Sequence, residues 1–595
     1  MLKILMMKQK NQRKLILINK FIFSLKTAMY KLYISDREYK EQSVVFSKDL
    51  KPTSIKVDAL KNKMFTQDIF DLNDEHITVH HSTVKSMPSI PAVLVLVGNR
   101  MFGKYKNKFL YKCVPDDKRL PIFLVPYKIK PGFNKKLVNK YITFEFRHWN
   151  VKHPFGVITQ TIGDVTILPN FYEYQLYCKS LYASIQDYTK KTMRKLKTKS
   201  ENEFIDEIIQ NYNLVDRRDE EIYSIDPLSS KDFDDAFSFK VKNDIAYLSI
   251  YIANVAIWLD ALDLWESFSN RIATIYLPDR KRPMLPTVLS DALCSLQENR
   301  NRFAFTLNLH INIKTLDIIH YEFTNSIIKV RKNLRYDTEE QETNEVYLNL
   351  KSFINSLNKN KKYKYIDNVE TSHDIIAYLM ILMNYISAKE MKRMKIGIYR
   401  SAKYNNLKEY IPPDSATKGV KKFLKMWRSS GGSYVKYENI EGHEILDLDA
   451  YVHITSPIRR LVDLLNILQF QHTIDIVKLN EKSRLFYEQW TNDKSFQYIN
   501  LTMRSIRKVQ NDCSLLKLCF DNEEVMKNVH DGFIFDKIIR NDGLYQYMIY
   551  IESINMVNRI TSMFDYENYS NQKCRLFLFT DEVRLKQKVR VEICN

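Results

Sequence analysis

Four aspartates lie close together in the stretch SIDPLSSKDFDDAFSF: Asp226, Asp232, Asp234 and Asp235. Carboxylates held a few ångströms apart repel one another, so a buried cluster needs protons, an Arg or Lys partner, or a divalent cation. A Mg²⁺ site for chemistry at phosphate is one interpretation of these residues. The other is a solvated acidic loop, and this segment alone does not decide between the two.

The residues around the aspartates narrow the kind of metal site. An EF-hand loop would need a further ligand and a glycine where Ala236 and Phe237 stand. The sequence also has no HExxH motif and no clustered Cys and His residues that would bind zinc. Hard oxygen ligands suit Mg²⁺ or Mn²⁺, and two such ions about 3.5–4 Å apart can clamp the attacking and leaving oxygens of a phosphate. We therefore expect hydrolysis or transfer at phosphate.

A second segment, YVHITSPIRRLVDLL at residues 451–465, has residue types that could bind that phosphate. Ser456 can cap a helix and Pro457 suits the first helical position, which predicts a helix start here. The free amides of that helix end, together with Arg459 and Arg460, would then face a phosphate group. The alternative is an ordinary capped helix with arginines on its surface.

The elements around the aspartates are predicted to be strands. The segment AFSFKV alternates in polarity, residues 242–244 form a turn, and residues 245–260 continue as a buried strand. Neighbouring aspartates of a fully extended segment would face opposite sides. We therefore expect a bend within residues 231–235 that brings all four carboxylates onto common ions.

The composition favours a polyanionic partner. The 595 residues include 91 Lys and Arg against 70 Asp and Glu, a formal net charge of +21. Such an excess implies binding to nucleic acid, and the Tyr and Phe residues interleaved with the charges suit base stacking. The alternative is that the lysines only solvate the surface. Strong dependence of nucleic-acid binding on salt follows from the first interpretation.

Cysteine usage and hydropathy bear on the environment of the protein. The seven cysteines are scattered and are predicted to be reduced core thiols. No apolar run approaches the roughly 18 residues that a membrane helix needs, so we expect a soluble protein without a membrane partner. Residues before Asp36 carry many lysines and no acid. We expect a basic arm and a cytoplasmic protein, with a mitochondrial one as the alternative.

Further motifs lie between the two segments and complete a pattern. They are Ile225–Pro227, Lys231–Ala236, Tyr276–Pro278, Pro283–Pro286, Leu293–Leu296 and Thr455–Arg460. In this combination and order the sequence resembles the RNB family, whose members are ribonuclease II, ribonuclease R and the hydrolytic subunit of the exosome. The resemblance is collinear from about residue 222 to residue 468 and weaker on both flanks.

The resemblance implies an exoribonuclease that hydrolyses single-stranded RNA processively from the 3′ end and releases nucleoside 5′-monophosphates. It also implies a monomer and an α+β multidomain fold. The short apolar runs of residues 41–169 and 529–593 agree with the small barrels of such a fold. The expected domains are a basic arm (1–40), two cold-shock OB-type β-barrels (41–130 and 131–215), an α/β RNB catalytic domain (216–525) and a C-terminal OB-type RNA-binding barrel (526–595).

Roles of individual residues follow from the resemblance. The four aspartates match the magnesium-site aspartates of the family, with Asp234 at the position of the essential catalytic ligand. Arg459 matches the arginine that contacts the scissile phosphate, where developing charge favours a fixed guanidinium. Tyr276 matches an aromatic residue that stacks near the 3′ end of the RNA; a half-buried strand tyrosine is the alternative.

The predicted catalytic residues are Asp234, Asp235 and Arg459, and the predicted RNA-binding residues are Tyr276, Thr455, Ser456, Arg459 and Arg460.

The chain departs from the family at two places. Ala377 and Tyr378 stand where relatives carry acidic residues, one of which contacts the terminal ribose, and Ile467-Leu468 replaces a His-Arg pair. These changes could alter the preference for RNA over DNA, because the 2′-OH contact provides that discrimination. Two alternatives to an active enzyme stay open: an RNA-binding regulator with an RNB fold, and an inactive structural subunit.

Overall fold

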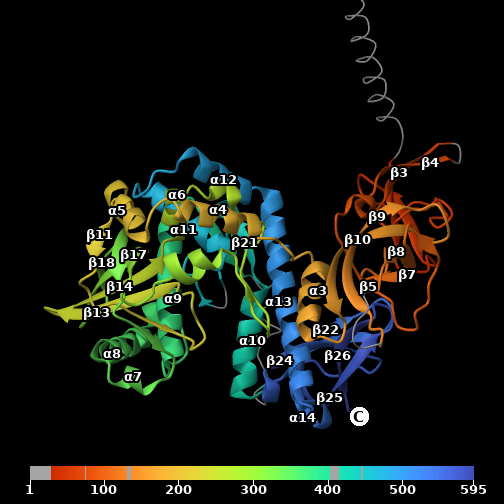
Figure 1. The fold of residues 1–595 in the computed structure, drawn as a ribbon. Coiled ribbons are helices and arrows are strands. Elements are labelled where there is room, and N and C mark those ends of the chain that lie inside the picture. The colour runs from red at the N-terminus through yellow and green to blue at the C-terminus, as the bar shows by residue number, and fades with distance from the viewer. Residues whose placement is uncertain are drawn as a thin grey trace, which may run out of the picture. The chain divides into compact units, whose positions relative to one another are not determined.

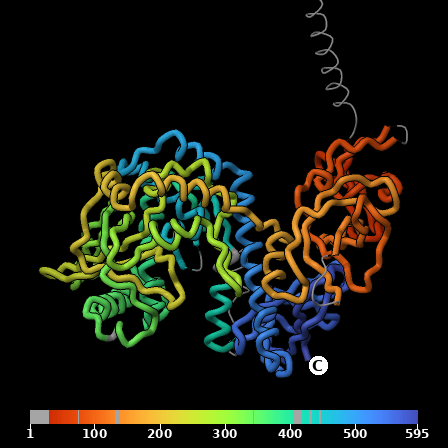
Figure 2. Tube along the Cα trace, viewed as in Figure 1, coloured from red at the N-terminus to blue at the C-terminus, as the bar shows by residue number. Residues whose placement is uncertain are grey.

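The computed structural model describes residues 29–73, 76–129, 136–402, 413, 416–443 and 446–594. The chain divides into two compact units, and Figures 1 and 2 colour it from its N-terminus to its C-terminus. Unit 1 comprises Met1–Ser180, Leu515–Asn528 and Leu576–Glu592, and unit 2 comprises Leu181–Ser514, Val529–Arg575 and Ile593–Asn595. Residues 1–28 of the predicted basic arm lie outside the described residues. The α+β multidomain prediction is confirmed.

Unit 1 contains a closed five-stranded barrel. Strand β5 pairs with both β7 and β9, β10 pairs with β9, and β8 joins β7 to β10, with β8 and β10 parallel. This order of pairing is that of an OB-type barrel. The strands are β5 (Ile90–Leu94), β7 (Lys108–Pro115), β8 (Phe123–Tyr127), β9 (Lys140–His148) and β10 (Phe155–Asp164), with β6 (Lys104–Tyr105) added at the edge.

The barrel corrects the predicted division between residues 130 and 131. Strands β8 and β9 lie on either side of that division and belong to one barrel, while residues 130–135 themselves lie outside the described residues. Barrel closure depends on pairings between distant strands, which a local change of composition does not reveal. A separate four-stranded sheet precedes the barrel: β1 (Tyr30–Ile34), β2 (Gln42–Phe46), β3 (Ile69–Asn73) and β4 (His76–His81), in the order β2-β1-β3-β4.

The region after the barrel is helical, although a second barrel was predicted to reach residue 215. Helix α5 begins with a capping box in which Ser200 and Glu203 satisfy each other's backbone amides. The short helix α2 (Thr83–Ser86) lies before the barrel. The helices that follow the barrel in the chain are α3 (Leu168–Cys178), α4 (Gln186–Leu196) and α5 (Glu201–Asn211).

Unit 2 is built on a seven-stranded sheet, whose long strands lie side by side in Figure 1. The predicted hairpin is confirmed: Lys242 pairs with Ile245 around a turn in which Asn243 and Asp244 both have positive φ. In sheet order the strands are β11 (Val215–Arg217), β18 (Ile318–Lys329), β17 (Asn301–Asn312), β14 (Ile245–Ala253), β13 (Asp235–Lys242), β12 (Tyr223–Asp226) and β19 (Lys332–Arg335).

The strand predicted over residues 245–260 is too long. It ends at Ala253, and residues 255–261 form helix α6. The apolar run VAIWL is buried on all sides, so its pattern did not distinguish a strand from a short buried helix. Helices α8 and α9 contribute to the same apolar core as strands β14 and β17.

The remaining helices of the chain are α6 (Val255–Ala261), α7 (Glu339–Glu342), α8 (Glu345–Lys359), α9 (Ser372–Arg393), α10 (Lys418–Gly431), α11 (Leu461–Thr473), α12 (Glu481–Thr491), α13 (Asp493–Asp521) and α14 (Glu524–Lys527). In the part of the chain that the structure describes, no helix is long and apolar enough to cross a membrane.

The strands predicted near the C-terminus are confirmed as a five-stranded sheet, and α10 packs on it. The ring of Phe423 stacks on that of Tyr550 with centroids 3.7 Å apart, and Trp427 donates a hydrogen bond to Asp536. The strands, in sheet order, are β24 (Met556–Ser562), β23 (Tyr545–Ile551), β22 (His530–Ile539), β25 (Ser570–Asp581) and β26 (Lys586–Ile593). The described residues also form two small antiparallel sheets: the hairpin of β15 (Ile275–Tyr276) with β16 (Lys281–Arg282), and β20 (Ile398–Ser401) with β21 (Ser433–Lys436), which lie on either side of α10 in the chain.

Three buried amides tie the central sheet to helix α11. Asn254 Nδ2 donates to Asn325 Oδ1 at 2.9 Å, and Asn325 Nδ2 donates to Gln471 Oε1 at 3.0 Å. Gln471 Nε2 closes the triangle on Asn254 Oδ1 at 3.4 Å. All three side chains are buried, so each amide depends on the other two.

We expect Gln471→Leu to lower the free energy of unfolding by about 2–4 kcal/mol, because it leaves Asn325 Nδ2 without its acceptor and Asn254 Oδ1 without its donor inside the protein. Urea denaturation measures the change. Gln489→Leu, at an exposed position of α12, is the control and should change stability by less than about 0.5 kcal/mol. A loss below about 1 kcal/mol in Gln471→Leu would contradict this role of the triangle.

Candidate active site

The aspartate cluster, defined as Asp226, Asp232, Asp234 and Asp235, lies where two adjacent strands meet a loop. Strand β12 ends at Asp226 and β13 begins at Asp235, and the two strands are antiparallel neighbours. The loop of residues 227–234 supplies the other two aspartates. The chain turns at residues 227–230, before the bend predicted within residues 231–235, and this loop lets side chains from both strand ends and the loop approach one another.

Asp234 is the most enclosed member of the cluster, with 4% of its surface exposed. Its Oδ1 accepts a hydrogen bond from the backbone amide of Ile458 at 2.9 Å, and its Oδ2 accepts one from Arg459 Nε at 3.2 Å. Burial raises the pKa of Asp234 to about 7, although Arg459 and the Ile458 amide act in the opposite direction. The bond to Arg459 joins two segments that are 225 residues apart.

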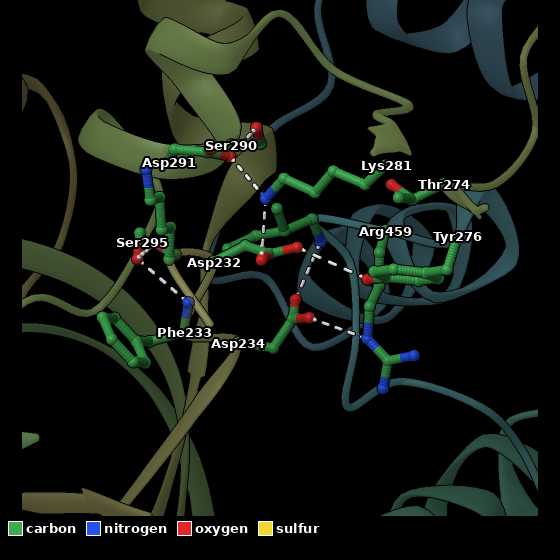
Figure 3. A network of polar contacts seen from close by, with 12 residues as sticks. Asp232, Phe233, Asp234, Thr274, Tyr276, Lys281, Ser290, Asp291, Ser295 and Arg459 are labelled. Carbon is green, nitrogen blue, oxygen red and sulfur yellow. Dashed lines mark hydrogen bonds and ion pairs between the residues drawn. The ribbon is translucent and has the colours of Figure 1, made fainter. Parts of the chain in front are cut away.

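Asp232 is held by a lysine (Figure 3). Lys281 Nζ lies 2.8 Å from Asp232 Oδ1 and 2.9 Å from Asp291 Oδ1. The hydroxyl of Tyr276 lies 3.5 Å from Asp232 Oδ2, on the other oxygen of the same carboxylate. Asp291 also accepts a hydrogen bond from the hydroxyl of Ser290. A cation and a phenol therefore flank Asp232.

Asp226 and Asp235 lie beside other carboxylates. Burial raises the pKa of Asp226 to about 7, with the charge of Asp232 adding to the effect. Burial, then the charges of Asp226 and Asp234, raise the pKa of Asp235 well above its usual value. Asp226 Oδ2 is buried without a hydrogen-bond partner. Arg335 and Arg459 lower the pKa of Asp226, and Arg459 lowers that of Asp235, but among the described residues neither carboxylate has an ion-pair partner within 4.0 Å as Asp232 and Asp234 do.

Among the described residues, no group of three or more His, Cys, Asp or Glu side chains is arranged to hold a metal ion. The four predicted ligands nevertheless influence one another's charge, so the fold brings them to one place. Two of them are turned to Lys281 and Arg459. The unsatisfied oxygen of Asp226 and the hard donor set fit Mg²⁺ or Mn²⁺.

The helix start predicted at Ser456 and Pro457 is wrong. Helix α11 begins at Leu461, and Arg460 before it has extended backbone angles. Residues 272–274 pair with this segment: Thr274 N donates to the carbonyl of Arg459, and Leu461 N donates to that of Ile272. Residues 456–460 form only a single turn, in which the amides of Arg459 and Arg460 donate to the carbonyl of Ser456. The amides of Ser456 and Ile458 donate to the carboxylates of Asp463 and Asp234, so the amides of this turn are not free to bind a phosphate.

Three of the predicted RNA-binding side chains lie in buried contacts. Arg460 forms an ion pair with the fully buried Asp463, with 2.9 Å between Nε and Oδ2. The hydroxyl of Ser456 accepts a hydrogen bond from Arg459 Nη2 at 2.9 Å, and both Ser456 and Thr455 are buried. These residues are placed to position Arg459 and its backbone.

The other two predicted RNA-binding residues are accessible. The side chain of Arg459 is 42% exposed, and Tyr276 is also 42% exposed. The pKa of Tyr276 is raised by burial of its hydroxyl and by the charge of Asp232. An exposed ring and an exposed guanidinium therefore border the cluster.

Two residues of the site were not predicted from the sequence, Lys281 and Tyr336. Tyr336 N donates to the carbonyl of Asp226 at 3.2 Å, and its ring stacks on His373 with centroids 3.6 Å apart. Burial, followed by the charges of Asp235 and Asp226, raises the pKa of Tyr336. The parallel pairing of β19 with β12 brings Tyr336 here, and no local pattern indicates that pairing.

Comparison with known proteins identifies a domain around this site. A family model described as "RNB domain" matches residues 214–344 and 338–475. Ribonuclease R of Chlamydia muridarum is 28% identical over 319 residues, which cover 43% of this chain and 46% of that protein. The chain spans less than half the length of the curated relatives that it matches first.

Solved structures show the same fold over most of the chain. RNase R of Mycoplasma genitalium, in complex with ribose-methylated single-stranded RNA, matches with a TM-score of 0.65 and 16% identity over 95% of this chain and 100% of that one. Yeast Ssd1, described as a pseudonuclease, matches with a TM-score of 0.55 and 13% identity over 91% and 80%. The fold alone does not distinguish a nuclease from a pseudonuclease. The distinction depends on the side chains of the site.

We expect Asp235→Asn to raise the free energy of unfolding of the metal-free protein at pH 7 by about 1–2 kcal/mol. The substitution removes a buried charge that repels Asp226 and Asp234. Because folding raises the pKa of Asp235 above its ordinary value of 3.8, this side chain destabilises the folded wild type at pH values above 3.8. The stability that Asp235→Asn gains over the wild type should therefore shrink as the pH falls towards 3.8.

Urea denaturation in EDTA measures this gain. Asp187→Asn is the matched control, because the Asp187 side chain is fully exposed and its substitution should change stability by less than about 0.5 kcal/mol. A less stable Asp235→Asn protein would show that the carboxylate is stabilised by its surroundings.

Proposed function

Because residues 214–475 of this chain form an RNB domain, we propose that the protein is a 3′-to-5′ exoribonuclease that hydrolyses single-stranded RNA to nucleoside 5′-monophosphates. The observation that carries the proposal is the aspartate cluster, complete in all four members and joined to Arg459 through Asp234. Relatives named ribonuclease R share the domain, and one of them has been solved with single-stranded RNA. The net charge of +21 supports an RNA substrate.

The cluster residues would hold divalent cations, with Mg²⁺ as the proposed metal and Mn²⁺ as a substitute. Asp226, Asp232, Asp234 and Asp235 are the proposed ligands, and two ions are the proposed arrangement. Bound there, the metal would activate a water molecule and neutralise the scissile phosphate. Supporting this assignment, Asp226 has a buried oxygen with no partner, and burial together with the charges of Asp226 and Asp234 raises the pKa of Asp235.

Arg459 and Tyr276 would position the RNA. The Nε of Arg459 is engaged by Asp234 and its Nη2 by Ser456, which fixes the plane of the guanidinium while its exposed edge can contact a phosphate. Tyr276 presents an exposed ring at the end of a two-residue strand, where a base can stack on it without regard to sequence. Thr455, Ser456 and Arg460 would support this arrangement from the buried side.

A second candidate function is an RNB-fold protein that binds RNA without cleaving it. The fold similarity to a pseudonuclease and the replacement of the acidic residue by Ala377 favour it. Ala377 is exposed on α9, whereas Tyr378 is buried and its hydroxyl donates to the carbonyl of Tyr363 at 3.0 Å. Neither residue supplies a carboxylate, but the complete aspartate cluster favours the enzyme.

We expect Asp234→Asn to reduce cleavage of 5′-labelled single-stranded RNA at least ~100-fold while the Kd for RNA changes less than about threefold. The substitution removes a metal ligand and the carboxylate that orients Arg459, but leaves the surfaces that carry the net charge. The assay follows shortening from the 3′ end with Mg²⁺ or with EDTA, and fluorescence anisotropy measures binding. Asp187→Asn, exposed on α4, should cleave like the wild type. A wild-type protein that binds RNA but never cleaves it with any divalent ion would favour the second candidate.

We expect Tyr276→Ala to raise the KM for single-stranded RNA about 5- to 100-fold, because it removes a stacking surface worth about 1–3 kcal/mol. Tyr276→Phe is the control: it keeps the ring and loses only a hydroxyl that lies 3.5 Å from Asp232, so its KM should stay close to that of the wild type. Equal effects of the two substitutions would assign the role to the hydroxyl instead of the ring.

A further inference from the structure

Lys281 places a positive charge inside the aspartate cluster. Its Nζ lies 2.8 Å from Asp232 Oδ1 and 2.9 Å from Asp291 Oδ1, and its side chain is only 23% exposed. Asp232 and Asp291 are enclosed too, so this pair of contacts is shielded from solvent more than a surface ion pair is. Figure 3 shows the ammonium between the two carboxylates.

The backbone around Lys281 fixes the direction of its side chain. Tyr276 and Lys281 are direct partners in the hairpin of β15 and β16, and both reach Asp232. The next residue, Arg282, is buried and forms an ion pair with Asp279 at 2.6 Å, which anchors the hairpin from its other side. The ammonium is therefore presented to Asp232 by an ordered element.

The charges of the cluster are balanced unevenly. Asp232 is paired with Lys281, and Asp234 is paired with Arg459. In the described part of the chain, Asp226 and Asp235 form no ion pair within 4.0 Å, although Arg335 stands opposite Asp226 in the parallel pairing of β12 and β19. One divalent cation would compensate these two remaining charges.

We propose that Lys281 occupies one cation position of the cluster in the RNA-free protein, so that a single divalent ion binds, on the side of Asp226 and Asp235. This proposal rests on the proposed function, and it names Lys281 as a positioning residue for the metal. Mg²⁺ binds oxygen at about 2.0–2.1 Å. An ion at that distance from Asp232 Oδ1 would lie against the ammonium, and the two cations would repel each other.

The same geometry suggests how a second ion would enter. The lysine ammonium is a point charge on a flexible stem, and it binds phosphate as readily as carboxylate. An RNA phosphate arriving beside Tyr276 and Arg459 would offer Lys281 another anionic partner. Asp232 would then be released to a second ion only when substrate is present.

The test is a Mn²⁺ titration of metal-free protein without RNA, in which electron paramagnetic resonance measures the free ion. We expect the wild type to bind one Mn²⁺ per chain, and Lys281→Met to bind two, because Asp232 becomes available. Lys281→Arg, which keeps the charge on Asp232, should bind one. Thermal denaturation with and without Mn²⁺ gives a second readout, in which the metal-induced rise in Tm should be larger for Lys281→Met than for the wild type.

Equal numbers of ions and equal affinities for the wild type and Lys281→Met would overturn the proposal, and so would two ions on the wild type. If Lys281→Met does not fold, Lys281→Gln, which keeps a polar side chain of similar length, carries the same expectation. The RNA cleavage assay is independent of this titration. A protein that shows the expected ion counts but never cleaves RNA would reject the proposed function alone, and a cleaving enzyme with equal ion counts would reject only the role of Lys281.

Discussion

The site depends on the contact between Asp234 and the segment of Ile458 and Arg459. One buried carboxylate accepts both a backbone amide and a guanidinium from residues more than 220 positions away in the chain. Only the carboxylate of this pair is buried, since the Arg459 side chain is 42% exposed, so the loss of either partner would leave the Asp234 oxygens enclosed with fewer hydrogen bonds. The loop after β12 and the segment before α11 are therefore fixed to each other at the point where the chemistry is proposed.

The contact with Asp234 is one of several that hold the TSPIRR segment outside helix α11. Its backbone pairs with residues 272–274, Ser456 N donates to Asp463, and Arg460 is extended. The segment thereby presents Arg459 to Asp234 while Arg460 turns to Asp463 inside the protein. The sequence alone does not distinguish these two adjacent arginines, but in the structure the Arg459 side chain is half-exposed beside the aspartate cluster and the Arg460 side chain is mostly enclosed beside Asp463.

The sequence predicted what is encoded locally. The hairpin of β13 and β14 follows from a short alternating pattern with a turn, whereas the bend expected within residues 231–235 lies at residues 227–230. Three features depend on distant pairings and were missed: closure of the barrel through β5, the delayed start of α11, and the approach of Lys281 to Asp232. A lysine in the stretch DRKRP looks like any surface cation until the hairpin of β15 and β16 directs it inward.

The places where the chain departs from the RNB family that it resembles are not among the ion pairs of the cluster. Ile467 and Leu468 are buried in apolar cores, and Ala377 is exposed on α9. Asp226 and Asp235, by contrast, are partly buried carboxylates whose pKa values are raised: burial and the charge of Asp232 raise that of Asp226, and burial with the charges of Asp226 and Asp234 raises that of Asp235. A protein that only bound RNA would gain stability by replacing either of them. The proposed divalent cation would account for this pair of acidic residues, and its presence is what distinguishes the proposed enzyme from a protein that only binds RNA.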